Sequence, residues 1–271
     1  MRIFSHFICL LILSSLSCGK KGDDNHIDSP INPEIVISAS DSPWYNNEKV
    51  TIGVSASVSI KEVNFYFNGS HIGGRIMTPW EIEFIPVDML PDVHEIIVKV
   101  KSESGTEYQD SINVSVAVRL GDDFLGGRIF HIDDGGKSGL IAFKTDLQVG
   151  DRKGFTWGPI GQADTDKTNG YQNTLRMSYL ATADYQAGYH FPLNLNGYDD
   201  WYIPAIEELE ILKENKHYVG GFSDASTWEA NFWSSSELSV TNAEALHFNV
   251  LTGNSYQKNQ YHLKIRPIRK F

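Results

Sequence analysis

Cysteine is almost absent from this sequence. The 271 residues contain two cysteines, Cys9 and Cys18, and both lie near the N-terminus. The rest of the chain therefore offers no pair for a disulfide bond and no thiolate for a zinc site. We expect the folded part to be stabilised by its packed core, without covalent cross-links.

Positive charge is also scarce. The chain has 23 basic and 34 acidic side chains and a net charge of -11. An acidic surface repels phosphate backbones, so nucleic acid is not an expected partner. Ser234, Ser235 and Ser236 lack the Gly-x-Ser-x-Gly elbow of a serine nucleophile. No His-Glu-x-x-His pattern occurs either. The sequence predicts no enzyme activity, no metal and no other cofactor.

Only one stretch is strongly apolar, and it lies at the very start. Residues 1–17 have a basic start, an apolar middle and a small-residue end, which is typical of a signal peptide. The segment Ser15-Leu16-Ser17-Cys18 resembles the lipobox of bacterial lipoproteins, which implies acylation of Cys18. Residues 18–33 are polar and predict a flexible tether. We expect a lipid anchor in the outer membrane, with the folded part exposed at the cell surface.

Residues 34–118 alternate apolar and polar side chains in short runs. This period of two is typical of strands with one buried face. Asn68-Gly69 follows one run and indicates a hairpin turn. The pattern predicts an immunoglobulin-like all-β sandwich, and it is similar to bacterial immunoglobulin-like domains, which mostly act as spacers. The predicted strands fall near 35–37, 50–54, 63–67, 80–84, 96–100 and 112–118.

Residues 119–271 mix patterns and predict a second domain, of the α+β class. Short apolar runs at 129–132 and 140–143 flank a Gly-rich turn. Residues 150–174 are long, polar and Gly-rich, which favours a functional loop. Helices are expected at 175–187 and from Pro204, since Pro suits a first helical position. The last strands are expected at 246–250 and 261–265.

Motifs in this second domain resemble a known family. In order they are Gly126-Gly127, Gly139-Leu-Ile-Ala, Asn196-Gly-Tyr-Asp-Asp-Trp-Tyr-Ile-Pro204, Trp233-Ser-Ser-Ser-Glu237 and Arg266-Pro-Ile-Arg269. They are similar to the C-terminal domain of the Legionella collagen-like adhesin and to the Fibrobacter major paralogous proteins. The resemblance implies an extracellular ligand-binding or adhesive role and, by fold analogy, a C-type-lectin-like fold.

Six residues are candidates for ligand contact. Trp157, Trp201 and Trp233 have rings that suit a sugar platform, although a place in the core is the preferred alternative for Trp201 and Trp233. Glu237 could help to bind a ligand. Arg266 and Arg269 belong to a C-terminal basic group, with Lys258, Lys264 and Lys270. That group suits a carboxylated or sulfated glycan, or alternatively a solvated strand in which an arginine pairs with a buried acid. Residues 162–169 form an oxygen-rich cluster, either a calcium loop or a plain turn.

The preferred function is a surface-tethered adhesive or ligand-binding module for glycans or matrix polymers. An unrecognised glycan- or peptide-acting enzyme is the first alternative, and a structural subunit of a surface assembly is the second. A carboxylate pair about 5–9 Å apart in an open cleft would favour the enzyme.

Overall fold

A computed structural model of the chain describes residues 33–224, 227–250 and 253–271. Cys18, the predicted signal peptide and the tether up to residue 32 lie outside the described residues. The chain separates into two units, Met1–Pro33 and Glu34–Phe271. Every described residue except Pro33 belongs to the second unit.

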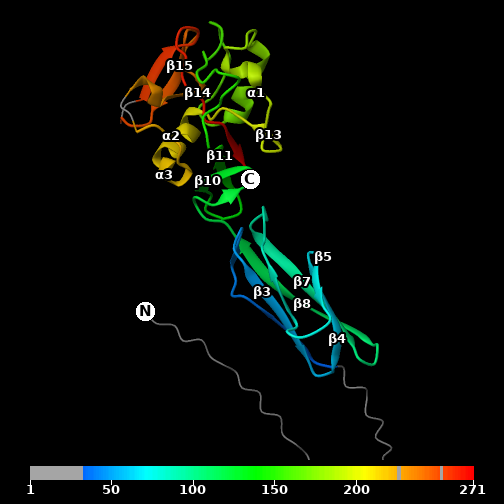
Figure 1. Ribbon diagram of the computed structural model, residues 1–271. Helices are drawn as coiled ribbons and strands as arrows, with labels where there is room; N and C mark the ends of the chain where they lie inside the picture. The colour runs from blue at the N-terminus through cyan, green and yellow to red at the C-terminus, as the bar shows by residue number, and fades with distance from the viewer. Residues whose placement is uncertain (1–32, 225–226, 251–252) are drawn as a thin grey trace, which may run out of the picture. The chain divides into compact units, whose positions relative to one another are not determined.

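Residues 35–117 form a β-sandwich of two sheets (Figure 1). One sheet has the order β1-β3-β6 and the other β2-β8-β7-β4-β5. All neighbours are antiparallel except β2, which runs parallel to β8. The strands are β1 (Ile35–Ala39), β2 (Trp44–Tyr45), β3 (Val50–Ala56), β4 (Ile60–Phe67), β5 (Ser70–Arg75), β6 (Glu81–Phe84), β7 (Asp92–Ser102) and β8 (Glu107–Ala117).

The alternating side chains of both sheets meet in one core, which confirms the predicted sandwich. Its buried residues come from β3 and β6 on one side and from β4, β7 and β8 on the other: Ile52, Val54, Ile82, Val63, Phe65, Ile96, Val98 and Val114. The predicted hairpin turn is also confirmed. Asn68 and Gly69 have φ values of 46° and 78° and connect β4 to β5. Both residues tolerate a positive φ, as this two-residue turn requires.

Residues 119–271 contain helices and three further sheets. The sheet orders are β17-β11-β10-β9, β12-β13 and β14-β15-β16. Strands are β9 (Asp123–Phe124), β10 (Gly127–Ile132), β11 (Gly139–Ala142), β12 (Leu193–Leu195), β13 (Tyr198–Trp201), β14 (Asn231–Glu237), β15 (Asn242–His247), β16 (Gly253–Gln257) and β17 (Ile268–Lys270). Helices are α1 (Gly170–Leu180), α2 (Ile206–Glu214) and α3 (Lys216–Val219), with short 3-10 turns η1 (Ala187–His190) and η2 (Trp228–Ala230). Resemblance to C-type lectins remains a prediction.

Three local expectations need correction. The helix expected at 175–187 is α1, which begins at Gly170 and ends at Leu180. It begins earlier because the Asn169 side chain accepts a hydrogen bond from the backbone N of Gln172 and caps it. The helix expected from Pro204 begins at Ile206. Residues 261–265 make only isolated bridges, to Phe155 and Phe232, and the last strand is β17.

Helix α2 packs against β10, β14 and β15, where it covers part of the core of this region (Figure 1). Its residues Ile206, Leu209 and Leu212 are buried, at the spacing predicted for one apolar helix face. Among the described residues, no helix has the length and apolarity needed to cross a membrane.

Candidate functional site

The three candidate tryptophans are core residues. Trp157, Trp201 and Trp233 are at most 1% exposed. Each indole N–H donates to a backbone carbonyl, at 2.8–2.9 Å: Trp157 to Ser234, Trp201 to Leu195 and Trp233 to Phe155. Of the two alternatives that the sequence leaves open, the core position is the one that the structure shows. None of the three rings has a face free for a ligand.

Glu237 is buried in an ion pair with Lys258. Lys258 Nζ lies 2.5 Å from the Glu237 carboxylate, 2.7 Å from the carbonyl oxygen of Gly161 and 4.7 Å from the centre of the Trp157 ring. The second carboxylate oxygen accepts hydrogen bonds from the backbone N–H groups of Ala163 and Asp164. The pair therefore holds the 150–169 loop against β14.

The two candidate arginines are also internal. Arg266 is fully buried and donates to Asp146 at 2.7 and 3.0 Å and to the carbonyl oxygen of Gly221 at 2.9 Å. Burial lowers the pKa of Arg266, and Asp146 opposes that shift. Arg269 donates to Asp200 at 2.9 Å and lies over the Tyr198 ring.

The whole C-terminal basic group is paired with acids. Besides the pairs just described, Lys264 lies 3.1 Å from Asp146 and Lys270 lies 3.8 Å from Glu208. The structure thus shows the pairing alternative and extends it from one arginine to all five basic residues. An anionic glycan would have to compete with these acids.

The serine and oxygen-rich clusters have structural roles. The hydroxyl groups of Ser234 and Ser236 donate to the carbonyl oxygens of Glu244 and Asp166. Asp166 accepts from the backbone N–H groups of Thr168 and Asn169, which lowers the pKa of its carboxyl group. This is the turn predicted as the alternative to a calcium loop. Within the described ranges, no group of three or more His, Asp or Glu side chains could hold a metal ion.

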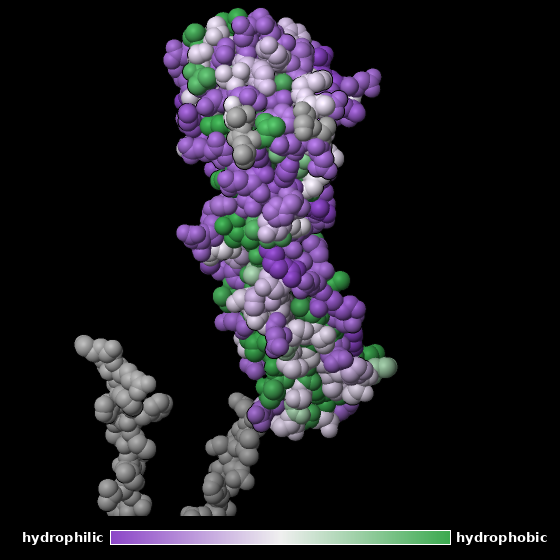
Figure 2. Space-filling model, turned by 90° about the vertical axis from the view of Figure 1, so that its left-hand side faces the viewer, coloured by the Kyte–Doolittle hydropathy of each residue, from purple (hydrophilic) through white to green (hydrophobic). Residues whose placement is uncertain are grey.

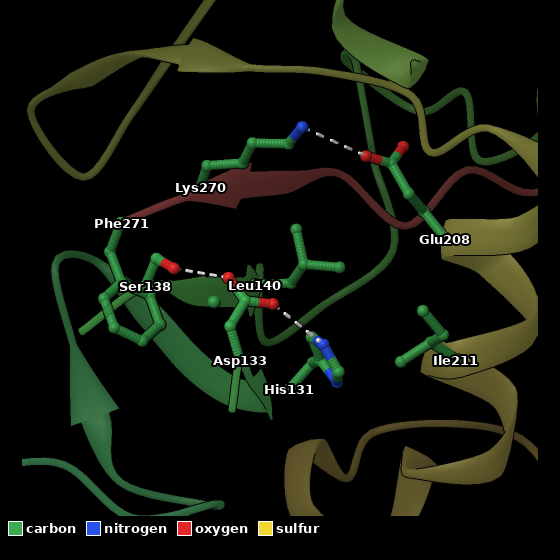
Figure 3. Close-up of a pocket in the computed structure, with 9 residues that line it drawn as sticks. His131, Asp133, Ser138, Leu140, Glu208, Ile211, Lys270 and Phe271 are labelled. Atoms are coloured by element: carbon green, nitrogen blue, oxygen red, sulfur yellow. Dashed lines mark hydrogen bonds and ion pairs between the residues drawn. The ribbon is translucent and has the colours of Figure 1, made fainter. Parts of the chain in front are cut away.

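A polar hollow of about 250 Å³ lies between the β10–β11 hairpin, α2 and β17 (Figure 3). Glu208 reaches it from α2, and Lys270 points toward that carboxylate from β17. On the opposite side Asp133 accepts from Ser138 and lies 3.1 Å from the His131 ring nitrogen.

The Glu208 carboxylate joins three segments. One oxygen accepts from the Tyr202 hydroxyl at 2.9 Å, and the other accepts from the backbone N–H groups of Ala205 and Gly170 at 2.9 and 3.1 Å. Burial raises the pKa of Glu208. These hydrogen bonds and the positive charge of Lys270 oppose the rise. Burial also raises the pKa of Tyr202, so its hydroxyl group stays protonated and can donate. The contacts of Glu208 stabilise the starts of α1 and α2.

A second hollow, of about 320 Å³, is lined by aromatic and uncharged polar side chains. We call it the aromatic hollow and define it by Trp228, Asn231, Tyr256, Gln260, Tyr261, His262 and Leu263. Trp228 and Tyr261 are 64% and 46% exposed. The Tyr256 and Tyr261 rings lie 5.0 Å apart, and Tyr256 packs at right angles on buried Trp233. The exposed Tyr261 ring is thus supported from the core, through Tyr256.

Asn231 is a buried residue of this hollow and bonds two of its neighbours. It is 4% exposed, and its amide nitrogen donates to the carbonyl oxygen of Trp228 at 3.0 Å. Its amide oxygen accepts from the Tyr256 hydroxyl at 3.1 Å. Burial raises the pKa of Tyr256, so this hydroxyl group remains a donor. One buried amide therefore fixes the backbone of Trp228 and the hydroxyl group of Tyr256.

Other polar groups of the hollow have no partner in the described part of the chain. Among the described residues, the indole N–H of Trp228, the Tyr261 hydroxyl and the side chains of Gln260 and His262 make no hydrogen bond. They can therefore meet a ligand without breaking a contact. Sequence reasoning missed them, because the polar surroundings of Trp228 and Tyr261 resemble those of the buried Trp201 and Trp233.

The surface outside this hollow is mixed. On the face shown in Figure 2, hydrophilic residues predominate and hydrophobic ones lie dispersed among them. Tyr179 on α1 is 85% exposed and belongs to neither hollow. It provides a matched aromatic control.

Comparisons with known proteins do not assign a family. No family model and no curated protein matches the chain. Several solved structures resemble part of it at low TM-scores. The fibronectin(III)-like modules of Clostridium thermocellum CbhA are 25% identical and match 31% of this chain and 98% of theirs, with a TM-score of 0.26. Carbohydrate-binding modules of the β-sandwich superfamily are 12% identical over 41% of this chain and 48% of theirs, with a TM-score of 0.29.

A third similar structure is the SGBP-B protein of the Bacteroides ovatus mixed-linkage glucan utilization locus, in complex with a mixed-linkage heptasaccharide. It is 14% identical over 49% of this chain and 38% of its own, with a TM-score of 0.26. The chain spans less than half the length of this structure and of the carbohydrate-binding modules. TM-scores of this size support no inference about function, which has to come from the site itself.

Proposed function

We propose that the chain is a glycan-binding module of the bacterial cell surface and that the aromatic hollow is its binding site. The observation that carries the proposal is the pairing of exposed rings with unpartnered polar groups in that hollow. Ligand sites combine apolar walls with a few polar groups that fix orientation. A sugar ring matches this combination, because its C–H faces pack on aromatic rings and its hydroxyl groups need hydrogen-bond partners.

The aromatic hollow suits the binding of a glycan without its hydrolysis. The residues that line it include no Asp or Glu, and glycoside hydrolysis ordinarily uses a pair of carboxylates. The carboxylates of the other hollow, Glu208 and Asp133, have internal partners. We therefore prefer a binding function over the enzyme alternative. Release of reducing ends from a bound polysaccharide would support the enzyme instead.

A polysaccharide pull-down tests the binding site. The Trp228→Ala and Tyr261→Ala variants should lose retention on polysaccharides that bind the unchanged chain. The Tyr179→Ala variant also removes an exposed ring, outside the hollow, and should bind normally. Circular dichroism checks that each variant is folded. Equal retention of all three variants would refute this site.

The surface location rests on the sequence, since Cys18 lies outside the described residues. We propose that Cys18 is acylated and holds the protein in the outer membrane, with the folded unit outside the cell. Radioactive palmitate should label the chain in cells but not a Cys18→Ala variant. Protease treatment of intact cells should remove the folded unit. Label in the Cys18→Ala variant, or protection from protease, would contradict the proposal.

We also propose that residues 119–271 belong to the adhesin C-terminal family that their motifs resemble. The constraints at several motif residues support this. A Cβ atom on Gly127 would lie 2.6 Å from the side chain of Ile141 and 2.9 Å from Trp201. Trp201 and Arg266 are buried and fully engaged. Such residues maintain the fold, so the motifs would mark a shared architecture rather than a shared ligand.

A further inference from the structure

We infer that the aromatic hollow selects uncharged polysaccharides over uronate-containing or sulfated ones. This inference rests on the proposed function and names the ligand class of the same site. It follows from three properties of the hollow: its charge, its hydrogen-bonding groups and its partial preorganisation.

The hollow offers no cation to an anionic ligand. No lysine, arginine, aspartate or glutamate lines it. The neighbouring residue Glu229 is exposed and adds a negative charge beside Trp228. The basic residues nearest in sequence are Lys258 and Lys264, which are paired with Glu237 and Asp146. A sulfate or carboxylate placed here would lose hydration without gaining an ion pair.

The free polar groups match hydroxyl groups. Gln260, Tyr261 and His262 can each donate and accept, while the Trp228 indole only donates. A sugar hydroxyl also donates and accepts, so it can satisfy every one of these groups. A carboxylate or sulfate only accepts and would leave the acceptor atoms of Gln260 and Tyr261 unpaired. Neutral sugars therefore use the hollow more completely.

Part of the hollow is held in place before a ligand arrives. The buried amide of Asn231 fixes the backbone of Trp228 and the hydroxyl of Tyr256, and Tyr256 in turn packs on Trp233. A site that is partly preorganised loses less conformational entropy on binding. This stabilises stacking on a sugar face, and stacking needs no charge.

Affinity electrophoresis of the folded chain tests the ligand class. Gels would contain a neutral polymer (starch, xyloglucan or galactomannan) or an acidic one (polygalacturonate or chondroitin sulfate). We expect retardation by at least one neutral polymer and none by the acidic ones. Isothermal titration with the bound polymer should give a similar affinity at about 50 and about 500 mM NaCl, since no ion pair is screened. Trp228→Ala should weaken binding by roughly tenfold or more. Glu229→Gln and Tyr179→Ala should leave neutral binding unchanged.

The outcomes separate the two proposals. Binding of acidic polymers alone, lost in Trp228→Ala and weakened by salt, would overturn the ligand class but keep the site. Neutral binding that Trp228→Ala does not change would overturn the site. Failure of every polymer to bind would overturn both.

Discussion

Replacement of Lys258 by Met tests whether the buried ion pair stabilises residues 119–271. Lys258 is fully buried, and its partner Glu237 is 9% exposed on the side chain. Removing the ammonium group leaves the carboxylate in the interior with only the N–H groups of Ala163 and Asp164 as donors. The carbonyl oxygen of Gly161 also loses its donor. The variant should therefore be strongly destabilised.

The magnitude follows from the loss of one partner of a buried pair, which costs about 3–5 kcal/mol. The two remaining N–H donors to Glu237 place the expected loss near the lower limit, at about 3 kcal/mol. Lys258→Met combined with Glu237→Gln removes the uncompensated charge. We expect the double variant to recover roughly half of the loss, because the two residues are directly coupled.

Urea unfolding followed by tryptophan fluorescence measures these losses, since the Trp157 ring lies against Lys258. Lys144→Met is the matched control. Lys144 lies 2.8 Å from Asp123, but the two side chains are 45% and 53% exposed. Such a surface pair contributes at most about 1 kcal/mol. If Lys258→Met lowers the free energy of unfolding no more than Lys144→Met does, the reasoning from burial is refuted.

Three further predictions concern the core and the polar hollow. Burial raises the pKa of Glu208 above its ordinary value of 4.5. Between 4.5 and the raised pKa, the folded chain therefore retains a proton that the unfolded chain releases. The contribution of this proton to the free energy of unfolding falls as pH rises through that window. Urea midpoints of the wild type should fall relative to Glu208→Gln across that window; parallel curves would contradict this. Gly188→Ala places a Cβ atom 2.5 Å from the Met177 carbonyl oxygen and should lower the free energy of unfolding by about 1–3 kcal/mol. Thermal unfolding measures this loss, and an unchanged midpoint would show that the chain has room for the methyl group. Phe65→Ala removes a ring from the sandwich core and should lower the free energy of unfolding by about 3–5 kcal/mol. Ile76 is 74% exposed, so Ile76→Ala should lower it by less than about 0.5 kcal/mol. Similar losses in the two variants would contradict the assigned core.

Local patterns in the sequence predicted much of the β-sandwich. The alternation in residues 63–67 places Val63, Phe65 and Phe67 on one face, and Asn68-Gly69 supplies the turn, so neither needs distant information. In residues 119–271 the boundaries were less predictable. Helix α1 begins at a cap inside a stretch that composition alone indicated as loop, and residues 261–265 make bridges rather than a strand.

The candidate site was predicted only in kind. Trp157, Trp201 and Trp233 were candidates for ligand contact or for the core, and they are buried. Trp228, which was not a candidate, is exposed. Nothing in the residue type separates these four positions. Their burial depends on which segments pack over them, and the covering segments are distant: the indole of Trp157 donates to Ser234 across 77 positions of the chain.

By itself the sequence determined the alternation of residues 63–67, the turn at Asn68 and the net negative charge, and it predicted the lipid anchor at Cys18. These depend on neighbouring residues and on composition. Only the tertiary structure decided that the C-terminal basic residues are neutralised and that Trp228 and Tyr261 form an open, uncharged hollow. Arg266 meets Asp146 from 120 positions away, and the free energy of such a contact depends on burial that no local pattern contains.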